Sequence, residues 1–185
     1  MAGTALIVVD MVNAYDFEDA ERLAPSVEAA LPAMRSLVDR AADDDALTIY
    51  VNDNFGAWRS NRDELVQSAM EGRHPHLVEP ISPQEHHLFV VKARHSIFYQ
   101  TPLEYLLEQK EVDRLVLVGQ VTEQCILYSA LDAHVRHFDV VVPRDAVAHI
   151  HEELAEAALT MMERNMGAEI CDARDCRLQA GAARA

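Results

Sequence analysis

Short runs of apolar residues alternate along the chain with longer segments in which apolar residues recur every three or four positions. A short, continuous apolar run suits a strand covered on both faces of a parallel sheet, whereas the wider spacing is that of an amphipathic helix. The runs that predict strands are residues 5–9, 47–51, 88–91, 115–118, 139–142 and 168–171. Their alternation with helical segments predicts an α/β fold with a doubly wound, mostly parallel six-stranded sheet, in a Rossmann-like three-layer αβα arrangement.

The helical spacing predicts helices over residues 25–42, 62–70, 101–110, 125–135 and about 154–166. Thr101 and Glu104, with Pro102 between them, match a capping box that has proline at the first helical position. Gly167 is a typical residue to end the last helix. Residues 72–84 contain a glycine and three prolines, which predicts an irregular connection.

The length of 185 residues is that of one domain with a substantial core. The chain contains no internal repeat, no interdomain linker and no low-complexity block. We therefore expect one domain over residues 1–178, followed by an Ala-rich tail over residues 179–185 that is frayed.

Charge and cysteine content narrow the class of partner. The formal net charge of −15 makes a nucleic-acid partner or an anionic membrane surface unfavourable. No apolar run approaches the roughly 20 residues of a spanning helix, and strand-like sequence from Thr4 leaves no room for a signal peptide. Three cysteines without a CxxC pair do not form a disulfide framework, so we expect a cytoplasmic protein.

Three side chains that can take part in catalysis lie at or just after the ends of predicted strands. Asp10 ends the first run, Lys92 ends the third, and Cys125 lies just past the turn after the fourth. Ligands of such sheets bind at the carboxyl ends of the strands, so the three should meet at one edge. Each has an ordinary explanation when taken alone, as a turn cap, a surface lysine or an inert buried cysteine. Their convergence is what favours a site.

Acyl transfer through a thiol needs these residue types. The thiol must lose its proton, a base must take that proton, and fixed donors must meet the developing oxyanion. Lys92 and the start of the helix would lower the pKa of the Cys125 thiol. Asp10 would take the thiol proton and later return it to a leaving amine. Backbone N–H groups of residues 121–125 would form the oxyanion hole.

Several segments in this order resemble the isochorismatase-like cysteine hydrolases, which include nicotinamidases and N-carbamoylsarcosine amidases. The matching segments are residues 6–13, 91–92 with 96–98, 119–125 and 145–146, so the resemblance spans nearly the whole chain. It implies an Asp-Lys-Cys triad of Asp10, Lys92 and Cys125. It also implies a cis peptide bond at Gln120-Val121 and an oxyanion hole made by the amides of Val121 and Cys125.

The sequence raises one conflict with this oxyanion hole. If Thr122 were a conventional N-cap, its hydroxyl would occupy the Cys125 amide. The implied turn would have to aim these groups differently.

The metal site of nicotinamidases is not matched here. Theirs begins with an Asp-x-His after the second strand, whereas Asp53 is followed here by Asn54 and Phe55. The nine histidines also lack the spacing of a closed metal site. We therefore expect no metal and no cofactor, and the substrate of a nicotinamidase is not implied.

Four aromatic residues fall in loops after strand ends and are candidates for the wall of a substrate pocket, although ordinary loop packing would explain them as well. They are Tyr15, Phe55, Trp58 and Phe98. Arg59 and Arg94 are candidates to bind a substrate carboxylate, with solvated charge as the ordinary alternative.

The function predicted is that of a cofactor-free cysteine hydrolase that cleaves a small amide or ureido-type substrate through a thioester. Isochorismatases themselves cleave a vinyl ether and typically lack this cysteine, so its presence favours C–N cleavage. One alternative is a catalytically retired, small-molecule-binding member of the same fold. Another is a phospho-receiver domain, which would need an acidic pair after the first strand and an aspartate where Lys92 stands.

The resemblance also implies assembly into a homo-oligomer, a dimer or a tetramer. The apolar residues of the helix after Cys125 (Leu127, Leu131 and Val135) give weak support, because they would serve equally well to cover the sheet.

Overall fold

The computed structural model describes residues 3–44, 46–58 and 61–179. Its strands are β1 (Gly3–Val9), β2 (Leu47–Asp53), β3 (Leu88–Lys92), β4 (Val112–Gln120), β5 (Asp139–Pro143), β6 (Val147–Ala148) and β7 (Glu169–Cys171). Its α-helices are α1 (Ala20–Asp43), α2 (Arg62–Met70), α3 (Pro75–Val78), α4 (Leu103–Gln109), α5 (Leu127–Val135) and α6 (Glu152–Met166). Three short helical turns complete the order, η1 (Glu79–Ile81), η2 (Thr122–Ile126) and η3 (Arg144–Ala146).

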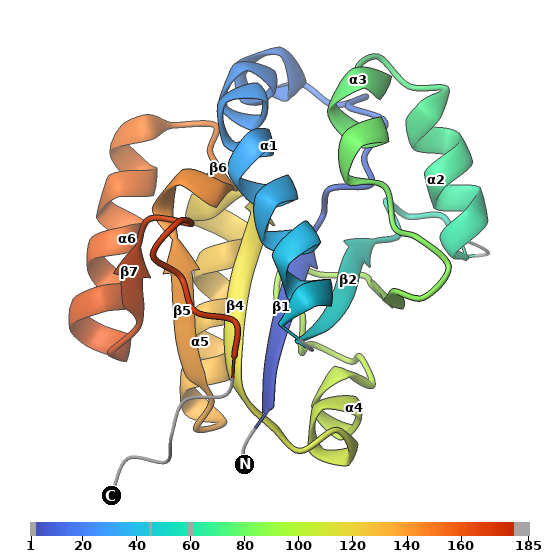
Figure 1. The fold of residues 1–185 in the computed structure, drawn as a ribbon. Helices are drawn as coiled ribbons and strands as arrows, with labels where there is room; N and C mark the ends of the chain where they lie inside the picture. The colour runs from blue at the N-terminus through green and yellow to red at the C-terminus, as the bar shows by residue number, and fades with distance from the viewer. Residues whose placement is uncertain (1–2, 45, 59–60, 180–185) are drawn as a thin grey trace, which may run out of the picture.

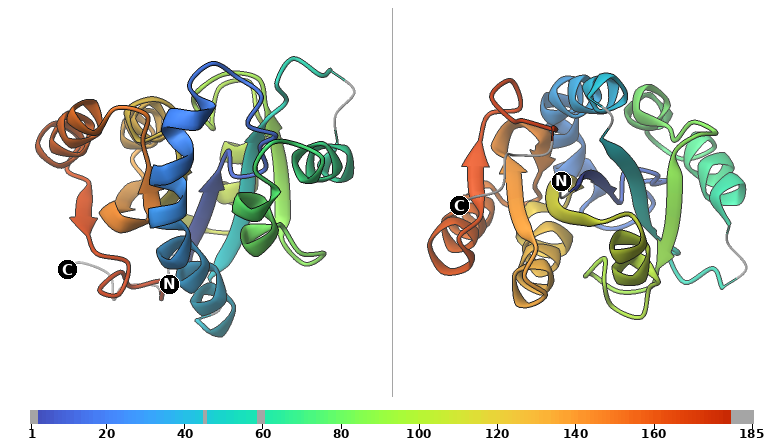
Figure 2. Two further views of the ribbon diagram at one scale, coloured as in Figure 1. Left: turned by 90° about the horizontal axis from the view of Figure 1, so that it is seen from above. Right: turned by 60° about the horizontal axis from the view of Figure 1, so that its bottom comes forward.

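The strands form one sheet in the order β3-β2-β1-β4-β5-β7, and β6 pairs with the end of β4. Every pairing is parallel. Helix α1 lies in front of the sheet and α5 behind it (Figure 1), and the two further views show helices on both faces (Figure 2). The predicted doubly wound α/β sheet is confirmed, with β6 as an addition. Two residues are too few to give a periodic signal, so sequence pattern could not reveal this strand.

The side chains of β1 divide between two cores. Leu6 and Val8 pack on one face with residues of α1, and Ala5, Ile7 and Val9 pack on the other with residues of α4 and α5. All five are essentially inaccessible to solvent. A strand covered on both faces is apolar throughout, which explains the unbroken run. The run ends at Asp10, where the chain leaves the sheet.

The structure changes three local predictions. Helix α1 begins at Ala20 and contains both Pro25 and Pro32, so it starts five residues before the predicted boundary. The segment predicted to be irregular contains α3 and η1. The N-cap of α4 is Pro102, and the hydroxyl of Thr101 donates to the carbonyl oxygen of Ile97. The predicted capping box is therefore wrong.

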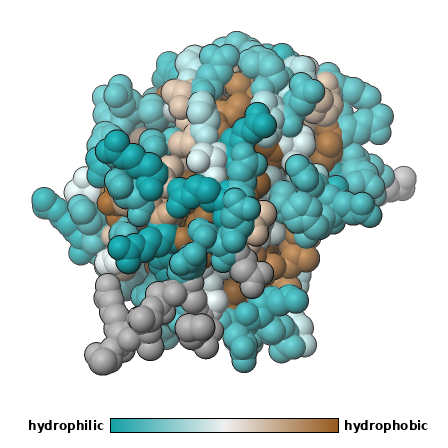
Figure 3. Space-filling view, viewed as in Figure 1, coloured by the Kyte–Doolittle hydropathy of each residue, from teal (hydrophilic) through white to brown (hydrophobic). Residues whose placement is uncertain are grey.

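The apolar residues of α5 do not all cover the sheet. Ala130 and Ala133 are buried against it, whereas Leu131 and Val135 are 48% and 61% exposed. By contrast, the face of the molecule in front of α1 is mostly hydrophilic (Figure 3), as the acidic composition leads one to expect. Among the described helices, none combines the length and apolar composition that crossing a membrane requires. The predicted tail falls almost wholly on residues 180–185, which lie outside the described residues.

Candidate active site

Asp10, Lys92 and Cys125 come together at the carboxyl edge of the sheet. Asp10 directly follows β1, Lys92 is the last residue of β3, and Cys125 lies in η2, the π-helical turn after β4. Strands β1 and β4 are neighbours, and β2 separates β1 from β3. The long side chain of Lys92 spans that extra strand and reaches both other residues. The convergence that parallel topology predicted is therefore present in the structure.

The ammonium group of Lys92 is the centre of this cluster. Its Nζ lies 2.8 Å from Oδ2 of Asp10, 3.4 Å from Oδ2 of Asp53 and 3.7 Å from Sγ of Cys125. The Lys92 side chain has no exposed surface. A buried cation of this kind needs partners for its charge, and the two carboxylates supply them. The same position places a positive charge beside the sulfur.

Asp10 is held on both of its oxygens. Oδ1 accepts the backbone N–H of Asp53 at 2.7 Å, and Oδ2 pairs with Lys92. Burial raises the pKa of the Asp10 carboxyl, and the charge of Lys92 opposes that rise. For Lys92, burial is the largest influence and acts to lower the pKa, but the charge and hydrogen bond of Asp10, together with Cys125 and Asp53, outweigh it, and the net pKa is raised. The pair is thus an ion pair with a carboxylate able to take up a proton.

The thiol of Cys125 behaves differently from the sequence expectation. Burial, the negative charge of Asp10 and a hydrogen bond from the thiol to that carboxylate raise the pKa of Cys125, and Lys92 opposes this only in part. The charge of Lys92 does act to lower the thiol pKa, as predicted, but the net pKa is raised because burial and Asp10 have the larger effect. Desolvation destabilises a thiolate at this depth more than one adjacent cation stabilises it. The resting sulfur is a protonated thiol that donates to Asp10.

The turn before Cys125 depends on a close approach of two strands. Gly119 has φ +115°, and a Cβ atom there would lie 2.2 Å from the carbonyl oxygen of Val9. Only glycine fits this position. The next peptide bond, Gln120–Val121, is cis. The Gln120 side chain also donates from Nε2 to the carbonyl oxygen of Asp10 at 2.7 Å, which ties the end of β4 to the end of β1.

Thr122 does not cap the helix that follows. Its hydroxyl donates to the carbonyl oxygen of Ala148 in β6 at 2.9 Å. Val121 occupies the N-cap position and makes no side-chain cap bond. The conflict that the sequence raised, in which the Thr122 hydroxyl would occupy the amide of Cys125, does not arise.

Two cavities adjoin the cluster. The first has a volume of about 580 Å³, and its walls include Asp10, Gln120, Val121 and Cys125. The second has a volume of about 690 Å³, and its walls include Lys92, Trp58, Arg94 and Tyr99. Asp53, Phe55 and His95 line both. The cysteine therefore faces a space of the size that holds a small molecule.

His95 is a member of the site that sequence reasoning missed. Its Nδ1 lies 3.7 Å from Sγ of Cys125, and its ring packs on Tyr128 of α5 with centroids 5.5 Å apart. The residue follows Lys92 by three positions, in a segment without regular secondary structure. No periodic pattern marks such a residue. Its proximity to Lys92 along the chain was the available signal.

The structure separates the four aromatic candidates into two pairs. Phe55 and Trp58 are exposed and line the cavities. Tyr15 is fully buried, with its hydroxyl donating to Oε1 of Gln120, and Phe98 is stacked on Phe138. Tyr15 and Phe98 therefore belong to the core. Of the two arginine candidates, Arg94 lines the second cavity, whereas Arg59 lies outside the described residues.

Asp53 stands at the position where the Asp-x-His pattern of a metal site would begin, but its two oxygens have other partners. Its Oδ2 faces Lys92, and its Oδ1 accepts the backbone N–H of Phe55 at 2.8 Å. Within residues 3–44, 46–58 and 61–179, no three His, Cys, Asp or Glu side chains gather in a way that could hold a metal ion.

Comparison with known proteins places this arrangement in a family. The isochorismatase domain model matches residues 4–175. An uncharacterized isochorismatase family protein of Bacillus subtilis, YaaI, is 34% identical over 169 residues, which cover 91% of this chain and 93% of that protein. The maleamate amidohydrolase of Pseudomonas putida is 29% identical over 172 residues, covering 88% and 80% of the two chains. The chain belongs to the isochorismatase family.

A solved structure supports the same fold. The N-carbamoylsarcosine amidase from Thermoplasma acidophilum has a TM-score of 0.71 to this chain at 23% sequence identity, with 94% of this chain and 98% of that chain covered.

Proposed function

We propose that this protein is a cysteine-dependent hydrolase that cleaves the C–N bond of a small amide or ureido-type substrate through a thioester intermediate. The observation that carries the proposal is the cluster of Asp10, Lys92 and the Cys125 thiol on the wall of a cavity. A similar protein is named a maleamate amidohydrolase and a structurally similar one an N-carbamoylsarcosine amidase, which supports this reaction class.

The first step is attack by Sγ of Cys125 on the substrate carbonyl carbon. The thiol proton passes to Asp10, to which the thiol is already hydrogen-bonded. Burial raises the pKa of the Asp10 carboxyl, so this carboxylate is a stronger base than one in water. Lys92 stays charged and stabilises the thiolate as it forms. The C–N bond then breaks, and the amine leaves with the proton that Asp10 took from the thiol.

The developing negative charge on the carbonyl oxygen needs fixed donors. We assign them to the backbone N–H groups of Val121 and Cys125, on either side of the turn that begins η2. The bond from Thr122 to Ala148 supports this assignment because it directs the hydroxyl away from the Cys125 amide. Water then attacks the thioester while Asp10 takes a proton from it; the C–S bond breaks, Asp10 returns the proton to the sulfur, and the acid product leaves.

The two cavities supply the specificity in this proposal. Phe55 and Trp58 provide apolar walls, and Arg94 can pair with a carboxylate on the substrate. The reaction uses no metal or cofactor in any of these steps.

The central test is turnover of maleamate, N-carbamoylsarcosine and nicotinamide by the wild type and by Cys125→Ala, followed by amine or ammonia release. We expect Cys125→Ala to abolish release, and mass spectrometry of quenched wild type to show an acyl adduct on Cys125. Retained turnover in Cys125→Ala would overturn the mechanism. Thermal stabilisation by these ligands without turnover would favour the retired binding protein. Phosphorylation by acetyl phosphate and Mg²⁺ would favour the receiver domain.

A reducing compartment, the cytoplasm, fits the state of the cysteines. Cys125, Cys171 and Cys176 are all free thiols, and free thiols persist where glutathione and thioredoxin keep them reduced.

We also infer that the protein forms a homo-oligomer, a dimer or a tetramer. The exposed apolar residues of α5 support this, because Tyr128, Leu131 and Val135 do not cover the sheet. We expect light scattering to give a mass above that of the 20.7 kDa chain, and Leu131→Glu with Val135→Glu to lower it. A clean monomer for the wild type would end this inference.

A further inference from the structure

We propose that Glu123 is a positioning residue, which fixes the turn that carries Cys125 so that the backbone N–H groups of Val121 and Cys125 meet the oxyanion. The inference rests on the proposed hydrolase function and gives a role to a carboxylate that the mechanism does not otherwise use. It arises from two hydrogen bonds, in which Oε1 of Glu123 accepts the backbone N–H of Ile150 at 3.0 Å and that of His151 at 2.8 Å.

The segment between β6 and α6, residues 149–151, depends on side chains for its backbone hydrogen bonds. It has no regular secondary structure. Oγ of Ser26 in α1 accepts the N–H of His149, and Glu123 accepts the next two N–H groups. A backbone donor that is left without a partner away from water costs free energy. These two side chains therefore determine where the segment lies.

Glu123 also supplies a cap that α6 lacks. The N-cap of this helix is His151, whose side chain makes no cap hydrogen bond. In a capping box the third helical residue is Glu or Gln and accepts the N–H of the N-cap, but in α6 this residue is Leu154. Glu123 accepts that N–H from outside the helix. Its negative charge lies at the positive end of the helix dipole, which strengthens the contact.

The same contact fixes the turn, because Glu123 lies between the two proposed donors along the chain. Glu123 is the second residue of η2 and Cys125 is the fourth. The preceding residue, Thr122, donates to the carbonyl oxygen of Ala148, so two consecutive side chains of the turn reach the same stretch of chain. The turn also packs against β6 and α6. One contact would leave the turn free to rotate about it, and the second prevents that rotation.

The attachment depends on one oxygen of the carboxylate. Oε2 of Glu123 is buried and has no hydrogen-bond partner among the described residues. Removal of the side chain would therefore break both bonds of Oε1 together. Ile150 also lines the cavity that Cys125 faces, so the attached segment is part of the wall beside the nucleophile. A misplacement of about 1 Å in such a site can lower a rate by about 10²-fold.

The test compares two reactions of the same sulfur. Acylation of Cys125 by p-nitrophenyl acetate passes through a tetrahedral oxyanion, whereas alkylation by iodoacetamide displaces iodide from a CH₂ group and forms none. Mass spectrometry of quenched samples gives the rate of each reaction at Cys125. We expect Glu123→Ala to lower the acylation rate by about 10- to 10²-fold, because the oxyanion loses its aligned donors. The alkylation rate should stay within about twofold of the wild type.

Ser26→Ala is the matched control. It removes the hydrogen bond to His149 in the same segment without touching the turn, so its ratio of acylation to alkylation should equal that of the wild type. Glu123→Gln keeps one acceptor oxygen, so its ratio should lie between those of the wild type and Glu123→Ala. This second variant carries the test if Glu123→Ala does not fold.

Equal losses of acylation and alkylation in Glu123→Ala would show a general structural role and would overturn the proposal. An unchanged acylation rate in Glu123→Ala would do the same, as would an equal loss of the ratio in Ser26→Ala or a Glu123→Gln ratio no higher than that of Glu123→Ala. A wild type whose Cys125 is alkylated but not acylated would instead overturn the thioester mechanism on which the inference rests.

Discussion

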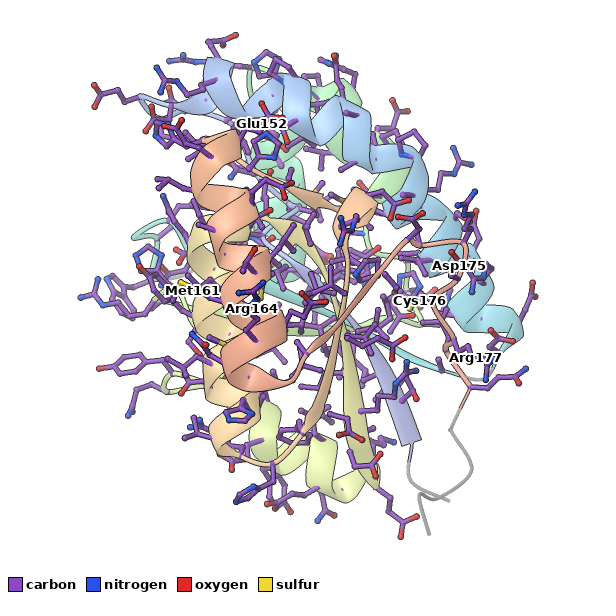
Figure 4. All side chains as sticks on the ribbon, turned by 90° about the vertical axis from the view of Figure 1, so that its left-hand side faces the viewer. Glu152, Met161, Arg164, Asp175, Cys176 and Arg177 are labelled. Atoms are coloured by element: carbon purple, nitrogen blue, oxygen red, sulfur yellow. The ribbon has the colours of Figure 1, made fainter. Side chains whose placement is uncertain are left out.

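Cys125 and Cys176 are both buried thiols, with 9% and 1% of their surfaces exposed, and burial raises the pKa of each. Their surroundings differ. Cys125 contacts the ionisable side chains of Lys92, Asp10 and His95 at the wall of a cavity. Cys176 lies on the segment after β7, between Asp175 and Arg177 (Figure 4), where Arg40 of α1 donates to its backbone carbonyl.

This difference shows that burial and pKa alone do not identify a reactive cysteine. Both thiols are held protonated by desolvation, which is the largest influence on each. Cys125 has a proton acceptor in contact and an open space beside it. Near Cys176, the guanidinium of Arg40 instead donates hydrogen bonds to the carbonyl oxygens of Ala173 and Cys176 and so holds this segment of the chain in place. The capacity for chemistry lies in the partners of the sulfur and in access to it.

The largest expected effect is on activity, when Asp10 beside Cys125 is replaced by a neutral side chain. Asp10→Asn keeps the size of the side chain but removes the base that accepts the thiol proton. We expect kcat/KM for a cleaved amide to fall by about 10²- to 10⁴-fold, as for loss of a general base. Cys176→Ser should leave it unchanged. Steady-state kinetics of both variants measures the contrast. Similar losses of kcat/KM in Asp10→Asn and Cys176→Ser would show that the surroundings of Cys125 are not what makes it the reactive thiol.

The next effect concerns stability. Lys92→Met leaves the buried carboxylate of Asp10 without its cation, and we expect the free energy of unfolding to fall by about 3–5 kcal/mol. Arg40→Met removes hydrogen bonds from a partly buried guanidinium and should cost about 1–3 kcal/mol. Guanidinium chloride denaturation measures both. The double variant Asp10→Asn with Lys92→Met should recover part of the loss, because no unpaired charge remains. A loss that is fully additive would contradict this account.

The last expected effect is a dependence of stability on pH that involves both regions. Burial raises the pKa of Cys171 to about 12 from its ordinary 9.0, and raises the pKa of Cys125 and Cys176 as well. The unfolded chain then loses its thiol protons first. The stabilisation is complete below about pH 9 and is lost as the pH rises toward the folded values, by up to about 1.4 kcal/mol per pH unit for each thiol.

Cysteine variants show how much each region contributes to this loss of stability at high pH. Cys125→Ser should remove the contribution of Cys125, and Cys171→Ser with Cys176→Ser should remove the contribution of the other two thiols. Denaturation midpoints between pH 7 and pH 10 provide the measurement. A wild type whose stability does not change between pH 8 and pH 10 would show that the thiols are not held protonated in the folded state.

What could be predicted from the sequence follows from the regularity of parallel sheets. Asp10, Lys92 and Cys125 were identifiable because each lies at or shortly after the end of a strand, and all strand ends of this kind share one edge. His95 could not be found in this way, since it sits in an irregular segment and its position depends on how that segment folds over α5. Tyr15 and Phe55 were equal candidates in the sequence, and both have a positive φ, yet Tyr15 is fully buried and Phe55 is 52% exposed, so loop position alone does not decide which aromatic residue reaches a cavity. The direction of the Cys125 pKa depends on burial depth, which no sequence pattern encodes.

The close contact at Gly119 has a practical meaning for protein engineering. Since a methyl group there would meet the carbonyl oxygen of Val9, which directly precedes Asp10, a substitution would push apart the two strands that carry the base and the nucleophile. The walls contributed by Phe55, Trp58 and Arg94 come from other loops and carry no such constraint. A library that varies those three positions and leaves residue 119 fixed would search for new substrates without disturbing the chemistry.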